Sequence, residues 1–329
     1  MNNLYILALI LLVAATSTVQ AEVNVYALSY AGFNITKWSN VSNSFVPFVN
    51  IPTLELRGYQ QVFNFNSTYL MGLANNVNDQ NQLYFLIDEV NLSNKTLIKS
   101  NGFNPATANN YQWSSAWWNP DTPSYFFVID NSLTLQTLSV KTGLPTSDFP
   151  ATKMPKVNNP AGYSAYIVYL PDTNLIYVIV SYGPGFGFKF GGLKCVSSTG
   201  CTYLFTYNFQ GKSVRSPLYL TPNFIGDQGY PTYVTYVNAT SLLYTGFDAT
   251  SSYLFSLNPQ TGATQIVVRF PTMQFPTSAT VAGGRIYVIG GAKSSVSNSV
   301  YVVYDLATKQ VVSTNNITGA PGRLLASAN

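Results

Sequence analysis

The stretch "GGRIYVIGGAKSSVSNSVYVVYDLATKQVV", residues 283–312, contains the pattern that decides the fold. An apolar run ends in Gly290-Gly291, a second run rich in Val and Tyr follows, and a polar turn opens at Tyr304-Asp305. Short runs rich in β-branched and aromatic residues, separated by Gly, Asn and Asp, are typical of β-strands joined by turns. The stretch therefore predicts two neighbouring strands followed by a polar turn.

The same unit recurs along the chain. The segment "SLLYTGFDATSSYLFSLNPQTGATQIVV" at 241–268 repeats it, and related units begin near residues 25, 82, 133 and 174. In the register that the pattern suggests, the second strand of each unit closes at Trp38, Asp88, Ser139, Asn208, Asn258 and Asp305. These positions are about fifty residues apart, with one gap about nineteen residues longer, and fifty residues suit one four-stranded propeller blade.

The repeat predicts an all-β fold: a single β-propeller domain spanning residues 22–329, with six four-stranded blades. The segment "PGRLLASAN" at 321–329 is expected to pair with the first unit near "VNVYALSY" at 23–30. Strands from the N- and C-terminal ends would then close the ring, which leaves fewer exposed strand edges. A seven-bladed ring and a β-sandwich are the alternatives that the pattern leaves open.

The final unit resembles the kelch-type repeat, since Gly290-Gly291 ends a strand and Tyr304-Asp305 opens the turn. A kelch repeat would place a Trp near Val311, and none is there. Other units, such as "LFSLNPQTG" at 254–262, are similar to the "LYxLDxxTG" blades of quinoprotein-like propellers. The resemblance implies a secreted propeller but no activity, because these families contain both binding proteins and enzymes.

Residues 1–21 are expected to be a signal peptide. The apolar run Leu4 to Ala15 is too short to span a bilayer, and small residues near Ala21 suit cleavage, although no Lys or Arg precedes the run. No later stretch is long and apolar enough for a membrane span, so we expect a secreted, extracellular protein. The two cysteines, Cys195 and Cys201, would then form a disulfide that closes a short loop.

Seven Asn-X-Ser/Thr sequons behind this signal indicate a glycoprotein; they are Asn34, Asn40, Asn66, Asn91, Asn94, Asn238 and Asn316. Blade strands are lettered a to d from the centre outward. The a–b and c–d turns emerge at one end of the ring, here called the turn face, and the b–c and d–a connections emerge at the other, the loop face. Five sequons fall on the predicted turn face, whereas Asn34 and Asn316 do not.

Composition removes most enzymatic mechanisms. The chain has no histidine, so His-dependent nucleophilic triads and His-ligated metals are absent. Neither a calcium loop nor a phosphate-binding loop is present, and no cofactor or metal is expected. The net charge of +4 forms no basic stripe, which argues against nucleic acid. An acid–base pair of carboxylates stays possible, with Asp227 and Asp248 as the candidates.

The stretch "SYGPGFGFKFGGLKCVSSTGC" at 181–201 is a long predicted b–c loop. Its alternating aromatics and one lysine would either fold back onto the ring or form a ligand-contacting finger; they are Phe186, Phe188, Lys189 and Phe190. The tryptophans of "YQWSSAWWNP" would serve inter-blade packing or sugar stacking; they are Trp113, Trp117 and Trp118. Asp227 is a further polar candidate, whereas Asp88 and Asp305 are interpreted as turn residues.

Three functions are compatible with these observations, and one of them is a largely structural surface or wall component. The favoured one is a non-enzymatic binding or adhesion module for an extracellular protein or glycan, acting through the loop face. The alternative is a carboxylate-dependent glycoside hydrolase or lyase with its site in the central channel.

Overall fold

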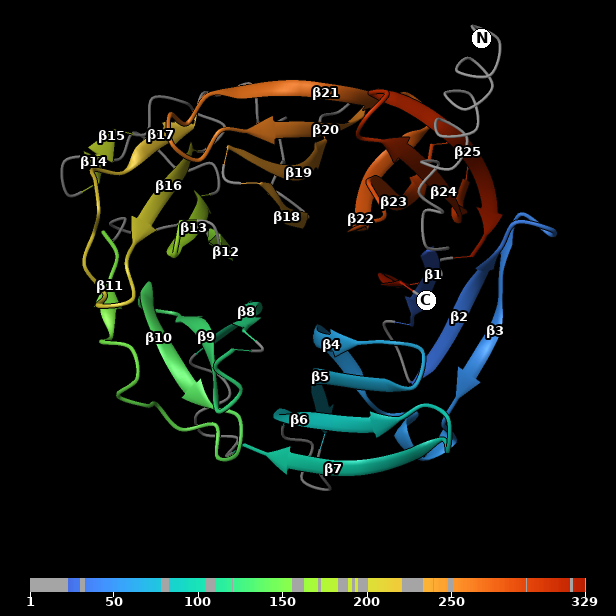
Figure 1. The fold of residues 1–329 in the computed structure, drawn as a ribbon, viewed down its shortest axis with the longest axis horizontal. Coiled ribbons are helices and arrows are strands. Elements are labelled where there is room, and N and C mark those ends of the chain that lie inside the picture. The colour runs from blue at the N-terminus through green and yellow to red at the C-terminus, as the bar shows by residue number, and fades with distance from the viewer. Residues whose placement is uncertain are drawn as a thin grey trace, which may run out of the picture.

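The computed structural model of the protein describes most of the predicted propeller. The described residues are 23–29, 33–77, 83–103, 111–119, 121–155, 163–170, 173–182, 189–190, 193–194, 201–220, 233–238, 240–247, 251–293, 295–319 and 322–328. They form six four-stranded antiparallel sheets arranged around a central axis (Figure 1). The predicted six-bladed, all-β propeller is therefore confirmed.

Blades 1 to 3 take the first part of the chain and its last described strand. From the inside outward, blade 1 consists of β26 (Arg323–Ala328), β1 (Val23–Leu28), β2 (Asn34–Ser39) and β3 (Ser44–Asn50). Blade 2 consists of β4 (Gly58–Phe65), β5 (Tyr69–Val77), β6 (Leu83–Asn91) and β7 (Thr96–Gly102). Blade 3 consists of β8 (Tyr111–Trp118), β9 (Tyr125–Asp130), β10 (Thr134–Ser139) and β11 (Thr152–Lys153).

Blades 4 to 6 complete the ring. Blade 4 consists of β12 (Tyr163–Leu170), β13 (Leu175–Tyr182), β16 (Cys201–Tyr207) and β17 (Leu218–Leu220), with a small hairpin of β14 (Lys189–Phe190) and β15 (Leu193–Lys194) in its b–c connection. Blade 5 consists of β18 (Tyr233–Asn238), β19 (Ser241–Phe247), β20 (Ser252–Leu257) and β21 (Thr264–Phe270). Blade 6 consists of β22 (Met273–Ala282), β23 (Arg285–Ala292), β24 (Ser295–Asp305) and β25 (Gln310–Thr318). A 3-10 turn, η1 (Pro52–Leu54), links blades 1 and 2.

The ring is closed by the C-terminal strand. β26 pairs with β1 in antiparallel register from Val23↔Ala328 to Leu28↔Arg323, so it becomes the innermost strand of blade 1. The predicted pairing of "PGRLLASAN" with the first unit is thus confirmed. Because β1 would otherwise present an open edge, this pairing satisfies the backbone groups along the inner edge of β1.

Every interface between neighbouring blades contains one hydrophobic cluster. Side chains alternate between the two faces of a strand, so one strand serves two clusters. In β9, Phe127 joins the cluster shared with blade 4, whereas Phe126 and Val128 join the one shared with blade 2. Strand β1 likewise divides between blades 2 and 6. Burial on both faces explains why inner strands such as β9 and β13 are almost continuously apolar.

A side-chain oxygen at the end of each c strand accepts hydrogen bonds from backbone N–H groups of the c–d turn. The six acceptors are Ser39, Asn91, Ser139, Asn208, Asn258 and Asp305. The turn interpretation holds for Asp305, but the predicted register is wrong in blades 1 and 2. Ser39 replaces Trp38, and Asn91 replaces Asp88, which lies inside β6.

Gly322 is a sensitive point of the ring closure. Its φ of +112° lies in a region that side chains rarely adopt, and an added Cβ would lie 2.0 Å from the Leu28 carbonyl oxygen. We expect Gly322→Ala to lower the free energy of unfolding by about 2 kcal/mol or more. Gly102→Ala is the control, because a Cβ there meets nothing within 4 Å. Equal denaturation midpoints for the two variants would contradict this role of Gly322.

Candidate functional site

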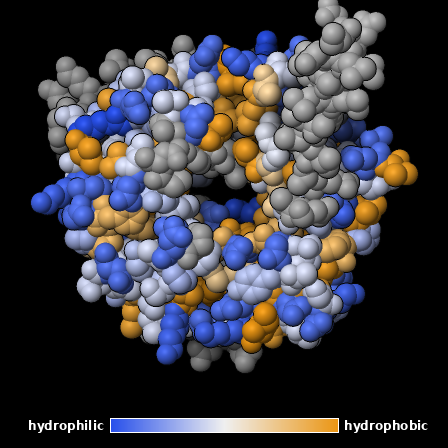
Figure 2. Space-filling view, viewed as in Figure 1, coloured by the Kyte–Doolittle hydropathy of each residue, from blue (hydrophilic) through white to orange (hydrophobic). Residues whose placement is uncertain are grey.

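The six innermost strands surround a central channel. Each contacts the next around the ring, in the order β26, β4, β8, β12, β18 and β22. Figure 2 shows the opening at the centre of the disc, with hydrophilic residues visible inside it. Within these six described strands, Arg323 is the only Asp, Glu, Lys or Arg residue. The strand-borne charge of the channel wall is therefore a single guanidinium group.

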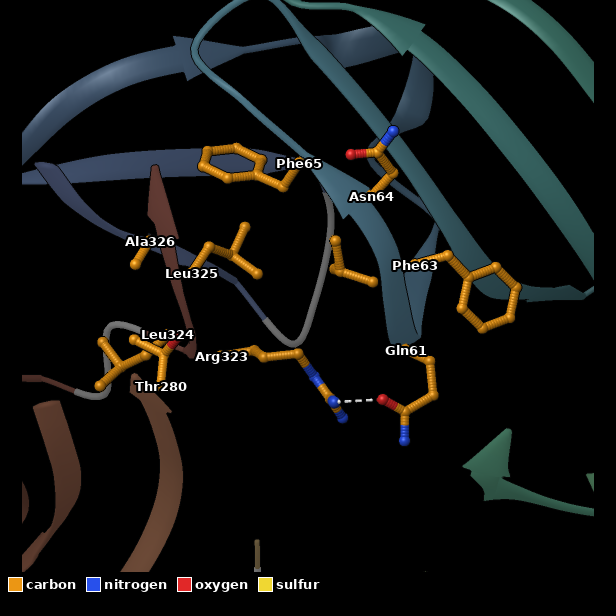
Figure 3. A pocket seen from close by; sticks show the side chains of 10 residues that line it. Gln61, Phe63, Asn64, Phe65, Thr280, Arg323, Leu324, Leu325 and Ala326 are labelled. Atoms are coloured by element: carbon orange, nitrogen blue, oxygen red, sulfur yellow. Dashed lines mark hydrogen bonds between the residues drawn. The ribbon is translucent and has the colours of Figure 1, made fainter. Parts of the chain in front are cut away.

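Arg323 lines a pocket of about 230 Å³ at the meeting point of blades 1, 2 and 6. The pocket wall is formed by β26, by residues 61–65 of β4, and by Thr280 of β22. The Arg323 Nη1 atom donates a hydrogen bond of 2.9 Å to Gln61 Oε1 across the seam between blades 1 and 2 (Figure 3). Because the amide oxygen of Gln61 faces the guanidinium, its other end is an NH₂ group, which donates hydrogen bonds.

Tyr166 of β12, on the opposite blade, is not part of the pocket wall but is influenced by the charge of Arg323. Blade 4 lies three positions from blade 1 around the ring, yet the charge of Arg323 still acts to lower the pKa of the Tyr166 hydroxyl. Burial outweighs that effect and raises the pKa to about 12, so the hydroxyl is protonated at neutral pH. The channel thus gathers a guanidinium, an amide and a phenol from three blades.

Arg323 lies at the loop-face end of the channel. It is the first residue of β26, and it pairs with Leu28, the last residue of β1 before the b–c connection of blade 1. Gln61 and Tyr166 pair with Leu73 and Ile179 in the middle of their blades. Arg323 therefore lies at the loop-face end of the pocket wall, whereas Asn64, Phe65 and Thr280 lie toward the turn-face ends of β4 and β22.

The sequence offered little sign of this pocket. Gln61 and Tyr166 lie in ordinary aromatic and polar runs, and Arg323 belongs to the segment predicted only to close the ring. Arg323 stands out only once the innermost strand of every blade is known. It is the one charged residue on those six described strands.

The predicted acid–base alternative gains no support from the described strands. None of the six described innermost strands bears an Asp or Glu. Asp227 and Asp248 lie outside the described residues, so their separation stays untested. In the described part of the chain, no group of three or more acidic or Cys side chains could hold a metal ion.

The predicted aromatic loop is only partly described. Phe186 and Phe188 lie outside the described residues. Lys189 and Phe190 form β14 and pair with Lys194 and Leu193 of β15. This hairpin lies in the b–c connection of blade 4, as the spacing predicted, and therefore belongs to the loop face.

Two of the predicted tryptophans pack between blades. The Trp117 ring lies 5.3 Å from Tyr169 of blade 4, whereas the Trp118 ring stacks 6.4 Å from Phe63 of blade 2. Trp113 lies in β8, and its side chain is not among those described. The structure thus directs Trp117 and Trp118 to opposite sides of blade 3, so these two rings do not share one stacking surface. A role of any of the three tryptophans in ligand binding stays a prediction.

The five sequons predicted on the turn face do lie there. Asn66 and Asn238 lie at a–b turns, and Asn40, Asn91 and Asn94 lie at c–d turns. In Asn66 and Asn238 the side-chain oxygen accepts hydrogen bonds from the backbone N–H and hydroxyl of the sequon threonine. Asn34 begins β2 and Asn316 lies within β25, away from these turns, as expected. Their glycosylation stays a prediction.

Only one cysteine of the predicted disulfide is among the described residues. Cys201 is buried at the start of β16, whereas Cys195 lies outside the described residues. The pairing of Cys195 with Cys201 therefore stays a prediction.

Asp88 belongs to a buried polar cluster and does not lie in a turn. Its side chain is inaccessible to solvent; Oδ2 accepts a 3.0 Å hydrogen bond from the Tyr59 hydroxyl, and Oδ1 lies 3.7 Å from Arg57 Nη1. Burial raises the pKa of Asp88, opposed by a hydrogen bond from Ser100 and by the charge of Arg57. The cluster ties β4 to β6 within blade 2 and is walled off from solvent, which indicates a structural role.

The raised pKa of Asp88 predicts an unusual pH dependence of stability. Its folded form holds the proton more tightly than the unfolded chain, so its stabilising contribution is complete below the ordinary value of 3.8 and declines as the pH rises through the folded pKa. The unfolding free energy of wild type, relative to Asp88→Asn, should therefore fall between pH 3 and pH 7.

Asp305→Asn provides a control of opposite sign. Hydrogen bonds from Thr308 and Ala307 hold the pKa of Asp305 below its ordinary value, so its contribution is lost as the pH falls. Urea unfolding of all three proteins across this range measures both slopes. A wild-type advantage over Asp88→Asn that grows with pH would show that the Arg57 charge dominates instead.

Comparisons with known proteins identify a fold and no family. No family model and no curated protein matches the chain. A protein from Lactobacillus plantarum superposes with a TM-score of 0.57 at 10% identity, over 93% of this chain and 99% of that one. A putative 6-phosphogluconolactonase from Bacteroides fragilis gives 0.50 at 10% identity, over 94% and 99%. TolB from Acinetobacter baumannii gives 0.51 at 11% identity, over 93% and 66%.

These likenesses support the propeller fold and do not single out the kelch type. At such low identity they carry over no activity, because one propeller scaffold hosts unrelated functions. No helix among the described residues is long and apolar enough to cross a membrane.

Proposed function

We propose that this protein is a secreted, glycosylated binding propeller that holds an extracellular protein or glycan against its loop face. The observation that carries the proposal is the separation of features between the two ends of the ring. Five sequons lie at turn-face positions, whereas the long b–c connection of blade 4 and the Arg323 side of the pocket lie at the loop face. Bulky glycans at the turns would leave the loop face accessible.

The composition of the channel favours binding over hydrolysis. Glycoside hydrolysis by the usual mechanism requires two carboxyl groups on either side of the bond that is cleaved. The six described innermost strands supply no carboxyl group, and the chain contains no histidine to replace one. Donor groups such as those of Arg323 and Gln61 can hold a ligand without reacting with it.

An added glycan can test which face binds. The substitutions Thr53→Asn and Glu55→Thr create a sequon in η1 and the turn after it, in the d–a connection on the loop face, where both side chains are exposed. We expect its glycan to block binding, because a large mobile sugar chain excludes a partner from that face. Binding is read on a glycan array and by pull-down from extracellular fluid, with protein from a glycosylating host.

A matched sequon on the turn face is the control. Lys309→Asn with Val311→Thr creates one at the c–d turn of blade 6, where both side chains are exposed and position 309 already has φ +56°. This variant should bind like wild type. If only the Lys309 variant lost binding, the partner would bind the turn face, and if wild type bound nothing in either assay, the binding function would be refuted.

A further inference from the structure

The Arg323 pocket has the chemistry of an anion site. Guanidinium N–H groups donate in a planar fork that matches the two oxygens of a carboxylate. The oxygen of Gln61 accepts a hydrogen bond from Arg323, so the other end of its amide is an NH₂ donor. The hydroxyl of Tyr166, on the opposite blade, is protonated and influenced by the charge of Arg323. A ligand that offers acceptors and a negative charge fits this set of donors.

The pocket volume narrows the class of ligand. About 230 Å³ accommodates one monosaccharide unit or a group of similar size. Arg323 lies at the loop-face end of β26, so the end of a chain can reach its charge more easily than the middle of one. The innermost strand of each blade pairs with one neighbour only, so its other edge faces the channel. An acidic peptide is therefore the competing occupant, and N-acetyl-aspartate serves as its probe.

We propose that the Arg323 pocket binds the terminal acidic sugar, a carboxylate-bearing monosaccharide such as a uronate, of an extracellular glycan. Arg323 pairs with the carboxylate, and Gln61 donates to a ring or hydroxyl oxygen. This inference rests on the proposed function and names the ligand class for its loop face. It also explains why one cation, and no carboxylate, occurs on the six described innermost strands.

Calorimetric titration with sodium glucuronate tests the proposal directly. Wild type should bind glucuronate and not glucose, and the affinity should fall with added salt because the attraction is partly ionic. Arg323→Gln should weaken binding about ten- to hundredfold, since a hydrogen bond to a charged group is lost. Gln61→Glu should do the same by placing a competing carboxylate beside Arg323.

Lys141→Gln is the matched control, because it removes one positive charge from an exposed c–d turn on the opposite face. It should bind glucuronate like wild type. Thermal melts establish that each variant is folded. If Arg323→Gln does not fold, Arg323→Lys keeps the charge without the fork and should still weaken binding.

Several outcomes would overturn the proposal. One is that wild type does not bind glucuronate, and another is that it binds glucose equally well. A third is that folded Arg323→Gln and Gln61→Glu bind glucuronate as tightly as wild type does. Equal binding of N-acetyl-aspartate would transfer the site to acidic peptides and remove the sugar assignment.

The loop-face variants separate this inference from the proposed function. Suppose that the ligand found is a neutral glycan or a protein, and that the Thr53 sequon blocks its binding while Arg323→Gln leaves the binding unchanged. That result would refute the acidic-sugar site and keep the loop-face function. Arg323-dependent glucuronate binding, with larger ligands unaffected by the Thr53 sequon, would keep the pocket and refute the loop-face function.

Discussion

The fold depends on each blade burying both of its faces against its neighbours. A four-stranded sheet alone would expose one or both apolar faces to water, and each square ångström of apolar surface removed from water stabilises by roughly 25 cal/mol. Six hydrophobic clusters fill the six interfaces between blades, and the last of them joins blade 6 to blade 1. Closure of the ring is therefore what gives the first and last blades their second neighbour. The scarcity of charge, at 9% of residues, follows from how little strand surface reaches solvent.

The burial of both faces of each blade also determined which features could be predicted from the sequence. The repeat length, the extra residues in blade 4 and the pairing of the C-terminal segment with β1 were all visible, because turns recur at even spacing. Strand ends were harder to place. In "LIDEVNLSN" both Asp88 and Asn91 are plausible turn residues, and β6 is buried on both faces around Asp88. Without an alternation of apolar and polar residues, nothing in the pattern marks where such a strand stops, and the register slipped by three residues.

The candidate site was less predictable than the fold. Its groups come from segments as distant as Gln61 and Arg323, which are 262 residues apart and meet only because the ring closes. Aromatic loops attract attention in a sequence because they are unusual locally. A lone arginine on an inner strand is unusual only relative to five other strands, and that comparison requires the blade order. The tryptophans of β8 illustrate the converse, since Trp117 and Trp118 stand out in the sequence and pack between blades.

The closing strand also has a consequence for biogenesis. Blade 1 receives its innermost strand from β26, which is synthesised nearly three hundred residues after β1. Until β26 is made, β1 exposes unpaired backbone N–H and C=O groups and an apolar face. The growing chain is therefore incompletely folded, and its strands can pair wrongly. Arg323, the charged residue of the channel wall, is also the first residue of β26. A chain that is still being synthesised therefore has neither a finished ring nor an assembled Arg323 pocket.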